Sequence, residues 1–158
     1  SHSTEINTPA REALANRKGV CQDFAHIMIA CLRAYGVPAR YVSGYLLTHP
    51  APGQPRLVGS DASHAWVSVY LPDPQTGASA GRWCDFDPTN NRDGWGSPGE
   101  DYATLAWGRD YADVSPLRGV IHGGANHRLK VAVTVEPADT PQWSGPSQDQ
   151  RQDQNQSQ

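Results

Sequence analysis

The residue of this 158-residue chain with the clearest chemical potential is Cys21, which stands where a long amphipathic pattern begins. The free backbone amides and the dipole at a helix N-terminus stabilise a thiolate there. The same amides can stabilise the oxyanion that forms when a thiolate attacks a carbonyl. Cys31 and Cys84 lack this position, and we interpret both as small buried hydrophobic residues. Cys21 is therefore the candidate nucleophile.

A thiolate nucleophile needs a general base, and the chain has six histidines. His64 opens the best strand pattern, directly after a long loop rich in Pro and Gly, so its ring could be anchored beside a cleft. His26 follows Cys21 by five residues on the same helix. It would lie about 140° around the axis, so we expect it to pack beside the helix. His64 is the candidate base.

A third group, a carboxylate, should orient that base. Asp85 and Asp87 share one face of a strand that returns after a turn at 72–80, and one of them should lie across from His64. The spacing leaves both open because the hairpin register is unknown, although Pro88 slightly favours Asp87. Trp66 shares a strand face with His64 and is a candidate substrate-binding residue, with a packed aromatic as the alternative.

A helix and a sheet are needed to position these residues. The helix is predicted over 21–35 from an i, i+3, i+4, i+7 stripe, namely Phe24, Ile27, Met28, Cys31, Leu32 and Tyr35. A shorter helix could start near Thr8 and Pro9. Strands are predicted at 39–47, 64–71, 82–87 and 127–136, and 102–111 is a strand or a helix. A helix followed by mostly antiparallel strands predicts the α+β class.

Composition limits the function classes. Hydrophobic residues make up 37% of the chain, which suits one domain with a modest core. We place this domain at 1–140, followed by a polar, Gln-rich tail at 141–158 that cannot bury apolar surface. The net charge of −3 argues against nucleic-acid binding, and no apolar stretch reaches the ~20 residues of a membrane span.

The three cysteines form neither a fully paired disulfide set nor a C-x-x-C zinc motif. Free thiols favour a reducing compartment, which predicts a cytoplasmic location. No acidic cluster has calcium-ligand spacing, so neither a metal nor a cofactor is expected.

Three sequence blocks, in order, resemble the transglutaminase-like superfamily. They are the Cys21 segment 17–40, the histidine strand Ser63–Val67 and the aspartate segment Trp83–Asn90. The segment Gly108–Val114 extends the similarity to a bacterial branch. The resemblance implies a papain-like α+β fold with the Cys21 helix packed on an antiparallel sheet. It also implies a Cys21–His64–Asp87 triad, which favours Asp87 over Asp85.

The same resemblance implies an enzyme that acts on amide bonds of a protein or peptide substrate. Hydrolysis through a thioester, as in a cysteine protease or amidase, is our first expectation. Acyl transfer to an amine is an alternative, and it would need an apolar tunnel that Trp66, Trp83 and Trp107 could build. A peptide-binding module without turnover is a second alternative. The bacterial branch commonly carries an N-terminal β-rich domain, so we expect this chain, which starts without Met, to be a fragment lacking it.

Overall fold

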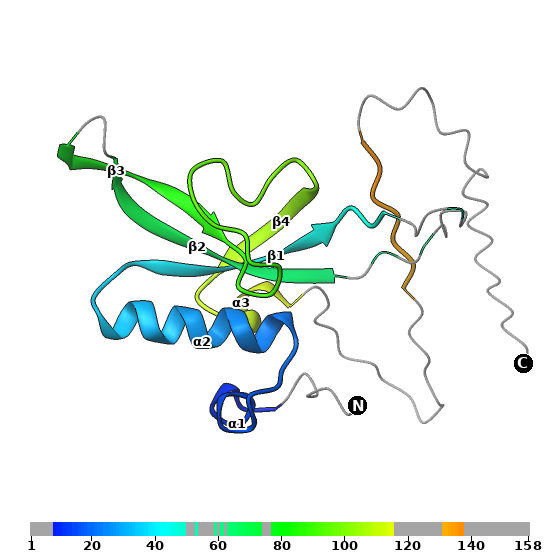
Figure 1. Cartoon of the computed structure of the whole chain (residues 1–158), viewed down its shortest axis with the longest axis horizontal. Helices are drawn as coiled ribbons and strands as arrows, with labels where there is room; N and C mark the ends of the chain where they lie inside the picture. Colours follow the sequence, from blue (N-terminus) through cyan, green and yellow to red (C-terminus); the bar gives the residue numbers. More distant parts are fainter. Residues whose placement is uncertain are drawn as a thin grey trace, which may run out of the picture.

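The structure is a computed structural model, and it describes residues 8–49, 53, 59, 61, 63–73, 77–115 and 131–137. Two helices come first, α1 (Ala10–Asn16) and α2 (Cys21–Ala34). The strands and a last short helix follow, namely β1 (Ala39–Leu46), β2 (Ser63–Asp73), β3 (Gly77–Phe86), β4 (Tyr102–Gly108) and α3 (Tyr111–Val114). Figure 1 shows α2 along one face of the sheet, with α1 packed beneath it. The predicted α+β class is confirmed.

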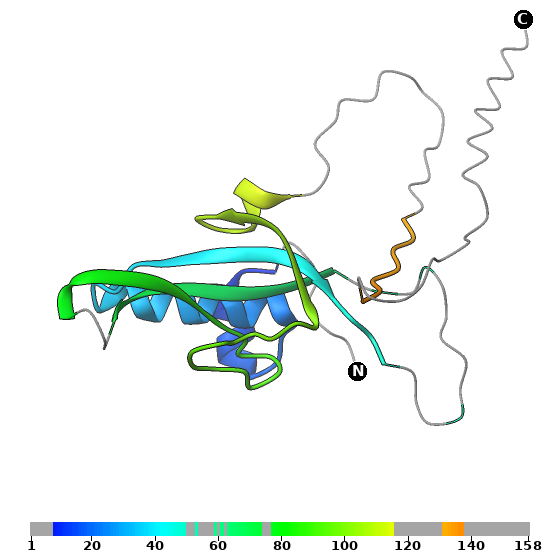
Figure 2. The same cartoon turned by 90° about the horizontal axis from the view of Figure 1, so that it is seen from above.

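The four strands form one antiparallel sheet in the order β3-β2-β1-β4. Seen from above in Figure 2, β1 and β2 run side by side over α2. On β1, Gly44 lies opposite His64 of β2, and Leu46 lies opposite Tyr102 of β4. The beginning of β2, the end of β1 and the beginning of β4 therefore meet at one end of the sheet.

The start of α2 is held by a buried carboxylate. Asp23 is 2% exposed, and its Oδ2 accepts a hydrogen bond of 2.9 Å from the backbone amide of Val20. This contact satisfies one of the amides that a helix start leaves unpaired. A Cβ at Gly19 would lie 2.8 Å from the Asp23 Cβ, so the chain needs a glycine at this close approach. The helix begins at Cys21 as predicted and ends one residue earlier than predicted.

The buried face of α2 differs from the predicted stripe. Its buried residues are Asp23, Ala25 and Ile29, with Cys21, Met28 and Leu32 partly buried against the core. Of the predicted stripe, Phe24, Cys31 and Tyr35 are exposed. The inward face is turned by about one residue, or about 100°. Small Ala25 lets the helix approach the sheet closely, and the capping role of Asp23 draws a polar side chain inward.

The prediction that Cys31 belongs to the core is therefore wrong, because its side chain is exposed. Cys84 is buried, as predicted. The ambiguous segment 102–111 is a strand that is followed, after a short turn, by the helix α3.

The predicted strand 127–136 is not a strand where the structure describes it. Residues 131–137 make a single bridge at Val133, whose carbonyl accepts from the Asp61 amide at 3.0 Å. The carboxylate of Asp61 accepts from the Val135 amide at 2.7 Å. Residues 127–130, most of the loop 48–63 and the tail 141–158 lie outside the described residues. Within the part that is described, no helix has the length and apolar character to cross a membrane.

Candidate active site

The Cys21 side chain lies at the first turn of α2 and is partly buried. Burial alone would raise the pKa of its thiol, but a hydrogen bond to the His64 side chain and the charge of that ring outweigh burial and lower the pKa. The backbone amides of Ala65 and Gln22 add to this lowering. The first turn of α2 thus stabilises a thiolate at Cys21.

The His64 ring is hydrogen-bonded on two sides. Its Nε2 lies 2.6 Å from Oδ2 of Asp87, which leaves Nδ1 for the hydrogen bond with Cys21. Burial alone would lower the pKa of His64, but the carboxylate of Asp87 and the sulfur of Cys21 raise the pKa to about 9. Near neutral pH these two groups therefore favour the protonated His64 ring, and this ring in turn favours the thiolate form of Cys21.

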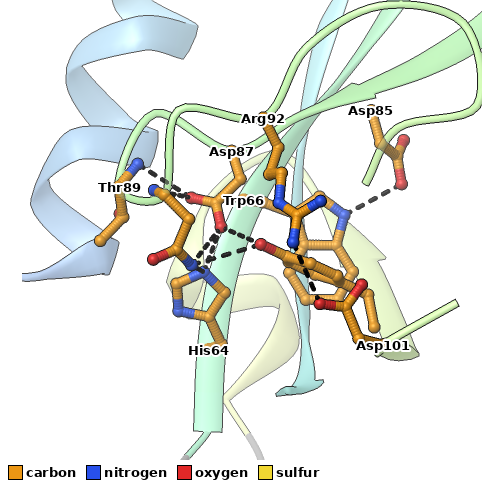
Figure 3. Close-up of polar contacts among 9 residues, drawn as sticks. His64, Trp66, Asp85, Asp87, Thr89, Arg92 and Asp101 are labelled. Atoms are coloured by element: carbon orange, nitrogen blue, oxygen red, sulfur yellow. Dashed lines mark hydrogen bonds and ion pairs between the residues drawn. The ribbon is translucent and has the colours of Figure 1, made fainter. Parts of the chain in front are cut away.

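The carboxylate of Asp87 is 1% exposed and fully engaged (Figure 3). Its Oδ1 accepts from the backbone amides of Thr89 at 2.9 Å and Asn90 at 3.3 Å. Its Oδ2 accepts from the Asn90 side-chain amide at 2.8 Å and the Tyr102 hydroxyl at 2.6 Å, in addition to His64. Burial alone would raise the pKa of Asp87, but the hydrogen bonds from His64 and Tyr102 hold the pKa well below its usual range.

The structure separates the two candidate acids. Asp87 contacts His64, whereas Oδ2 of Asp85 accepts a hydrogen bond of 2.9 Å from the indole nitrogen of Trp66. Trp66 is 0% exposed, and its ring stacks on that of His64 with centroids 6.1 Å apart. A side chain without exposed surface has none to offer a substrate, so the interpretation of Trp66 as a packed aromatic is favoured. It supports the His64 ring from within the sheet.

The aromatic tunnel considered for acyl transfer is not formed by the three tryptophans. Trp83 and Trp107 instead stack on the Arg40 guanidinium, whose carbon lies 4.1 Å and 4.9 Å from their ring centroids. Arg40 lies opposite Ser68, which is four residues along β2 from His64. Trp66 is the one of the three that contacts the His64 ring.

His26 packs beside the helix, as expected. Its Nε2 accepts a hydrogen bond of 3.2 Å from the Tyr111 amide, and its ring lies 5.0 Å from that of Tyr41. The role of His26 is thus to join α2 to α3 and β1.

Thr89, Asn90 and Tyr102 did not emerge from the sequence as site residues. The run Asp87-Pro88-Thr89-Asn90 carries a usable signal, because an Asp before a turn commonly accepts from the amides two and three residues on. Tyr102 has no such signal, because it reaches Asp87 from another strand. Its contribution depends on the return of the whole 88–101 segment.

Comparisons with known proteins bear on the family and the fold of the chain. The sequence pattern of the transglutaminase-like superfamily matches residues 1–88, which is more than half of the chain. The crystal structure of a candidate cysteine protease from Cytophaga hutchinsonii is similar, with a TM-score of 0.57 and 29% sequence identity over 92% of this chain and 43% of that one. The predicted fold, papain-like with the Cys21 helix packed on an antiparallel sheet, is confirmed.

Several bacterial sequences are also similar. An uncharacterized protein of Mycobacterium tuberculosis is 49% identical over 138 residues, which are 87% of this chain and 42% of that protein. The protein-glutamine gamma-glutamyltransferase of Pseudomonas aeruginosa is 39% identical over 75 residues, which are 46% of this chain and 10% of that enzyme. The chain thus spans about two fifths of the length of the mycobacterial relatives. Together, these similarities support a thiol-enzyme family.

Proposed function

Because the chain belongs to the transglutaminase-like superfamily, we propose that it is a cysteine-dependent enzyme that hydrolyses amide bonds of protein or peptide substrates. In this proposal Cys21 is the nucleophile, His64 is the general base and acid, and Asp87 orients the imidazole. Neither a metal nor a cofactor takes part in the steps.

The first half of the reaction forms a thioester. The Cys21 sulfur attacks the carbonyl carbon of the substrate, a C–S bond forms, and the carbonyl oxygen becomes an oxyanion. The free amide of Cys21 at the start of α2 is the proposed donor to that oxyanion. When the intermediate collapses, the C–N bond breaks and the His64 imidazolium gives its proton to the leaving amine.

The second half of the reaction consumes water. Neutral His64 takes a proton from a water molecule, and the oxygen attacks the thioester carbonyl. The C–S bond then breaks, which releases a carboxylic acid and restores the thiolate–imidazolium pair. Asp87 keeps one proton on Nε2 throughout, so that Nδ1 is the atom that exchanges protons with the reacting groups.

One observation carries this proposal: His64 is hydrogen-bonded to Cys21 on one side and to Asp87 on the other, at the first turn of a helix. A nucleophile, its base and a group that orients the base are the three parts of an activated thiol. A merely structural cysteine would not need a buried, fully hydrogen-bonded carboxylate behind its histidine.

The test is the pH dependence of Cys21 alkylation by iodoacetamide. Because Cys31 is exposed and would also react, the experiment uses a Cys31→Ala background. We expect an inflection well below the free-thiol value of about 8.5, and its loss in the His64→Ala variant. An inflection at the free-thiol value in both proteins would instead favour a peptide-binding module without turnover.

Acyl transfer to an amine is the second candidate, and it is favoured by the similarity to the Pseudomonas glutamyltransferase. An amine would then replace water in the second half of the reaction. Mass spectrometry of a Gln-containing peptide incubated with a primary amine separates the two outcomes. A product in which ammonia is replaced by the amine indicates transfer, whereas a product in which ammonia is replaced by water indicates hydrolysis.

A further inference from the structure

Beyond the three proposed catalytic residues, we propose that Tyr102 is a positioning residue that holds Asp87, and through it the His64 ring, against Cys21. This inference rests on the proposed function, because it assigns a further residue to the same site. It concerns a contact between two segments that lie at opposite edges of the sheet.

Tyr102 opens β4, whereas Asp87 directly follows β3, and these two strands are the outer strands of the sheet. The Tyr102 side chain therefore spans the end of the sheet to donate its hydroxyl to Oδ2 of Asp87 at 2.6 Å. On the way its ring packs edge-on against His64, with centroids 5.9 Å apart, and against Trp66, with centroids 5.3 Å apart. One tyrosine thus contacts the carboxylate, the imidazole and the indole that supports the imidazole.

Gly44 makes this crossing possible. It lies on β1, opposite His64 on one side and Thr104 on the other, where the register between β1 and β4 shifts. A Cβ at this position would overlap the Ala103 carbonyl oxygen and lie 2.6 Å from the Trp66 ring. A glycine therefore lets β4 and the Trp66 ring come close to β1 at this end of the sheet.

The two oxygens of Asp87 are held in different ways. Backbone amides hold Oδ1, so its hydrogen bonds do not depend on a neighbouring side chain. Side chains alone hold Oδ2, the oxygen that faces His64. Without the Tyr102 hydroxyl, Oδ2 keeps only Asn90 beside the imidazole. The orientation of the imidazole ring towards Cys21 therefore depends on Tyr102.

The Tyr102 hydroxyl remains a donor over the working pH range. Burial and the hydrogen bond to Asp87 raise the pKa of Tyr102 to about 12. The charged and titratable groups that face Tyr102 are Asp87, the His64 ring and Arg92, which is ion-paired with Asp101 at 3.3 Å. The charge of Arg92 lowers the pKa of Tyr102, but less than burial and Asp87 raise it.

The experiment compares Tyr102→Phe with Tyr45→Phe, both in the Cys31→Ala background. Tyr45 lies next to β4, opposite Ala103, and its hydroxyl makes no hydrogen bond to the part of the chain that is described. For Tyr102→Phe we expect kcat to fall about tenfold with KM within about twofold, equivalent to about 1.4 kcal/mol of activation free energy. The Cys21 alkylation inflection should also rise by about 0.5–1 pH unit towards the free-thiol value. Tyr45→Phe should change neither.

Two results would overturn the inference. One is a folded Tyr102→Phe protein with a lower melting temperature but an unchanged kcat and an unchanged inflection, because that pattern is purely structural. If Tyr102→Phe does not fold, 3-fluorotyrosine at position 102 keeps the ring and strengthens the donor. An inflection that then stays unchanged is the other contradicting result.

The two proposals fail in different ways. If His64→Ala leaves the Cys21 inflection unchanged, the proposed function fails. If His64→Ala removes the inflection while Tyr102→Phe leaves it in place, only the role of Tyr102 fails.

Discussion

The two cysteines of α2 show opposite combinations of access and activation. Cys21, in the first turn, is partly buried, and His64 and two backbone amides lower the pKa of its thiol. Cys31, ten residues later, is exposed, and no described side chain hydrogen-bonds to its thiol. Exposure alone therefore does not single out the proposed nucleophile. The hydrogen-bond partners of Cys21 and its place at the start of the helix are what favour it.

The two ends of the helix are also anchored differently. At the start, buried Asp23 accepts from the Val20 amide, and the activated thiol lies next to this cap. At the end, Arg33 donates to the carbonyls of Ala39 and Arg109, and its side chain is exposed. Buried polar contacts cost more to disrupt than exposed ones, so changes at the start of α2 should have the larger effects.

The largest difference in kcat/KM should appear between two single variants, Cys21→Ala and Cys31→Ala. Cys21→Ala should lower kcat/KM by at least about 10³-fold, because no other group can form the thioester. Cys31→Ala should leave kcat/KM within about twofold, because its side chain contacts no part of the proposed site. Steady-state kinetics on one peptide substrate measure both. An equal loss in a folded Cys31→Ala protein would refute the assignment of the nucleophile.

The two candidate acids, Asp85 and Asp87, allow a second comparison, with a smaller expected difference in kcat. Asp87→Asn should lower kcat by about 10²–10⁴-fold, because an amide cannot accept from all five donors and no longer stabilises the imidazolium. Asp85→Asn should change kcat by less than about threefold, because its amide oxygen can still accept from the Trp66 indole. Kinetics at saturating substrate distinguish these outcomes. Similar losses in both variants would mean that the acid has been assigned incorrectly.

The cap at the start of α2 should matter for stability. Asp23→Ala leaves the Val20 amide without its partner, and we expect the free energy of unfolding to fall by about 1–2 kcal/mol. Cys31→Ala, near the other end, should change it by less than about 0.5 kcal/mol. Urea denaturation followed by circular dichroism gives both values. The anchoring argument fails if Cys31→Ala is the more destabilising change.

The smallest effect is expected in the pH dependence of stability. His64 has a raised pKa, so its contribution to the free energy of unfolding is fully present below about pH 6.5 and is lost as the pH rises through about 9. The lowered pKa of Cys21 acts in the opposite direction, because its contribution grows as the pH rises towards about 8.5. In the wild type these two opposite changes in the free energy of unfolding should largely cancel between about pH 6.5 and 8.5.

Cys21→Ala removes the contribution to the free energy of unfolding that rises with pH, and leaves that of His64, which falls. The variant's free energy of unfolding should then fall by about 1 kcal/mol more than that of the wild type over this pH range. Urea denaturation at several pH values measures the difference. Parallel pH profiles for the two proteins would show that the thiol and the imidazole do not titrate as a pair.

Local sequence patterns predicted the positions of helices and strands better than they predicted which face of the helix is buried. The helix 21–35 could be placed because Cys21 begins an apolar period and Gly36 ends it, with a φ of +73° in the structure. Its inward face could not be placed, because hydropathy ranks Phe24 above Ala25, whereas the structure buries the smaller residue against the sheet.

The same limit applies to the site. His64 and Asp87 could be proposed from strand position, from the turn and from a resemblance that covers both. Tyr102 could not be proposed, because its contact with Asp87 joins the two outer strands and depends on the whole sheet order. The predicted strand 127–136 failed for a related reason. Its hydropathy alternates as in a strand, but in the described part, residues 131–137, no neighbouring strand pairs along its length.

The hydrogen bond between Asp87 and Tyr102 closes the chain between them into a ring. Within it, Arg92 pairs with Asp87 through two backbone hydrogen bonds of 2.8 Å and 3.0 Å. Once the two ends of a loop are held, doubling its length costs only about 0.6 kcal/mol of closure entropy. The stretch from Asp93 to Glu100 can therefore change in length at little cost in closure entropy. The contacts that such a change would have to respect are those of Gly94 with Cys84 and of Trp95 with Arg82.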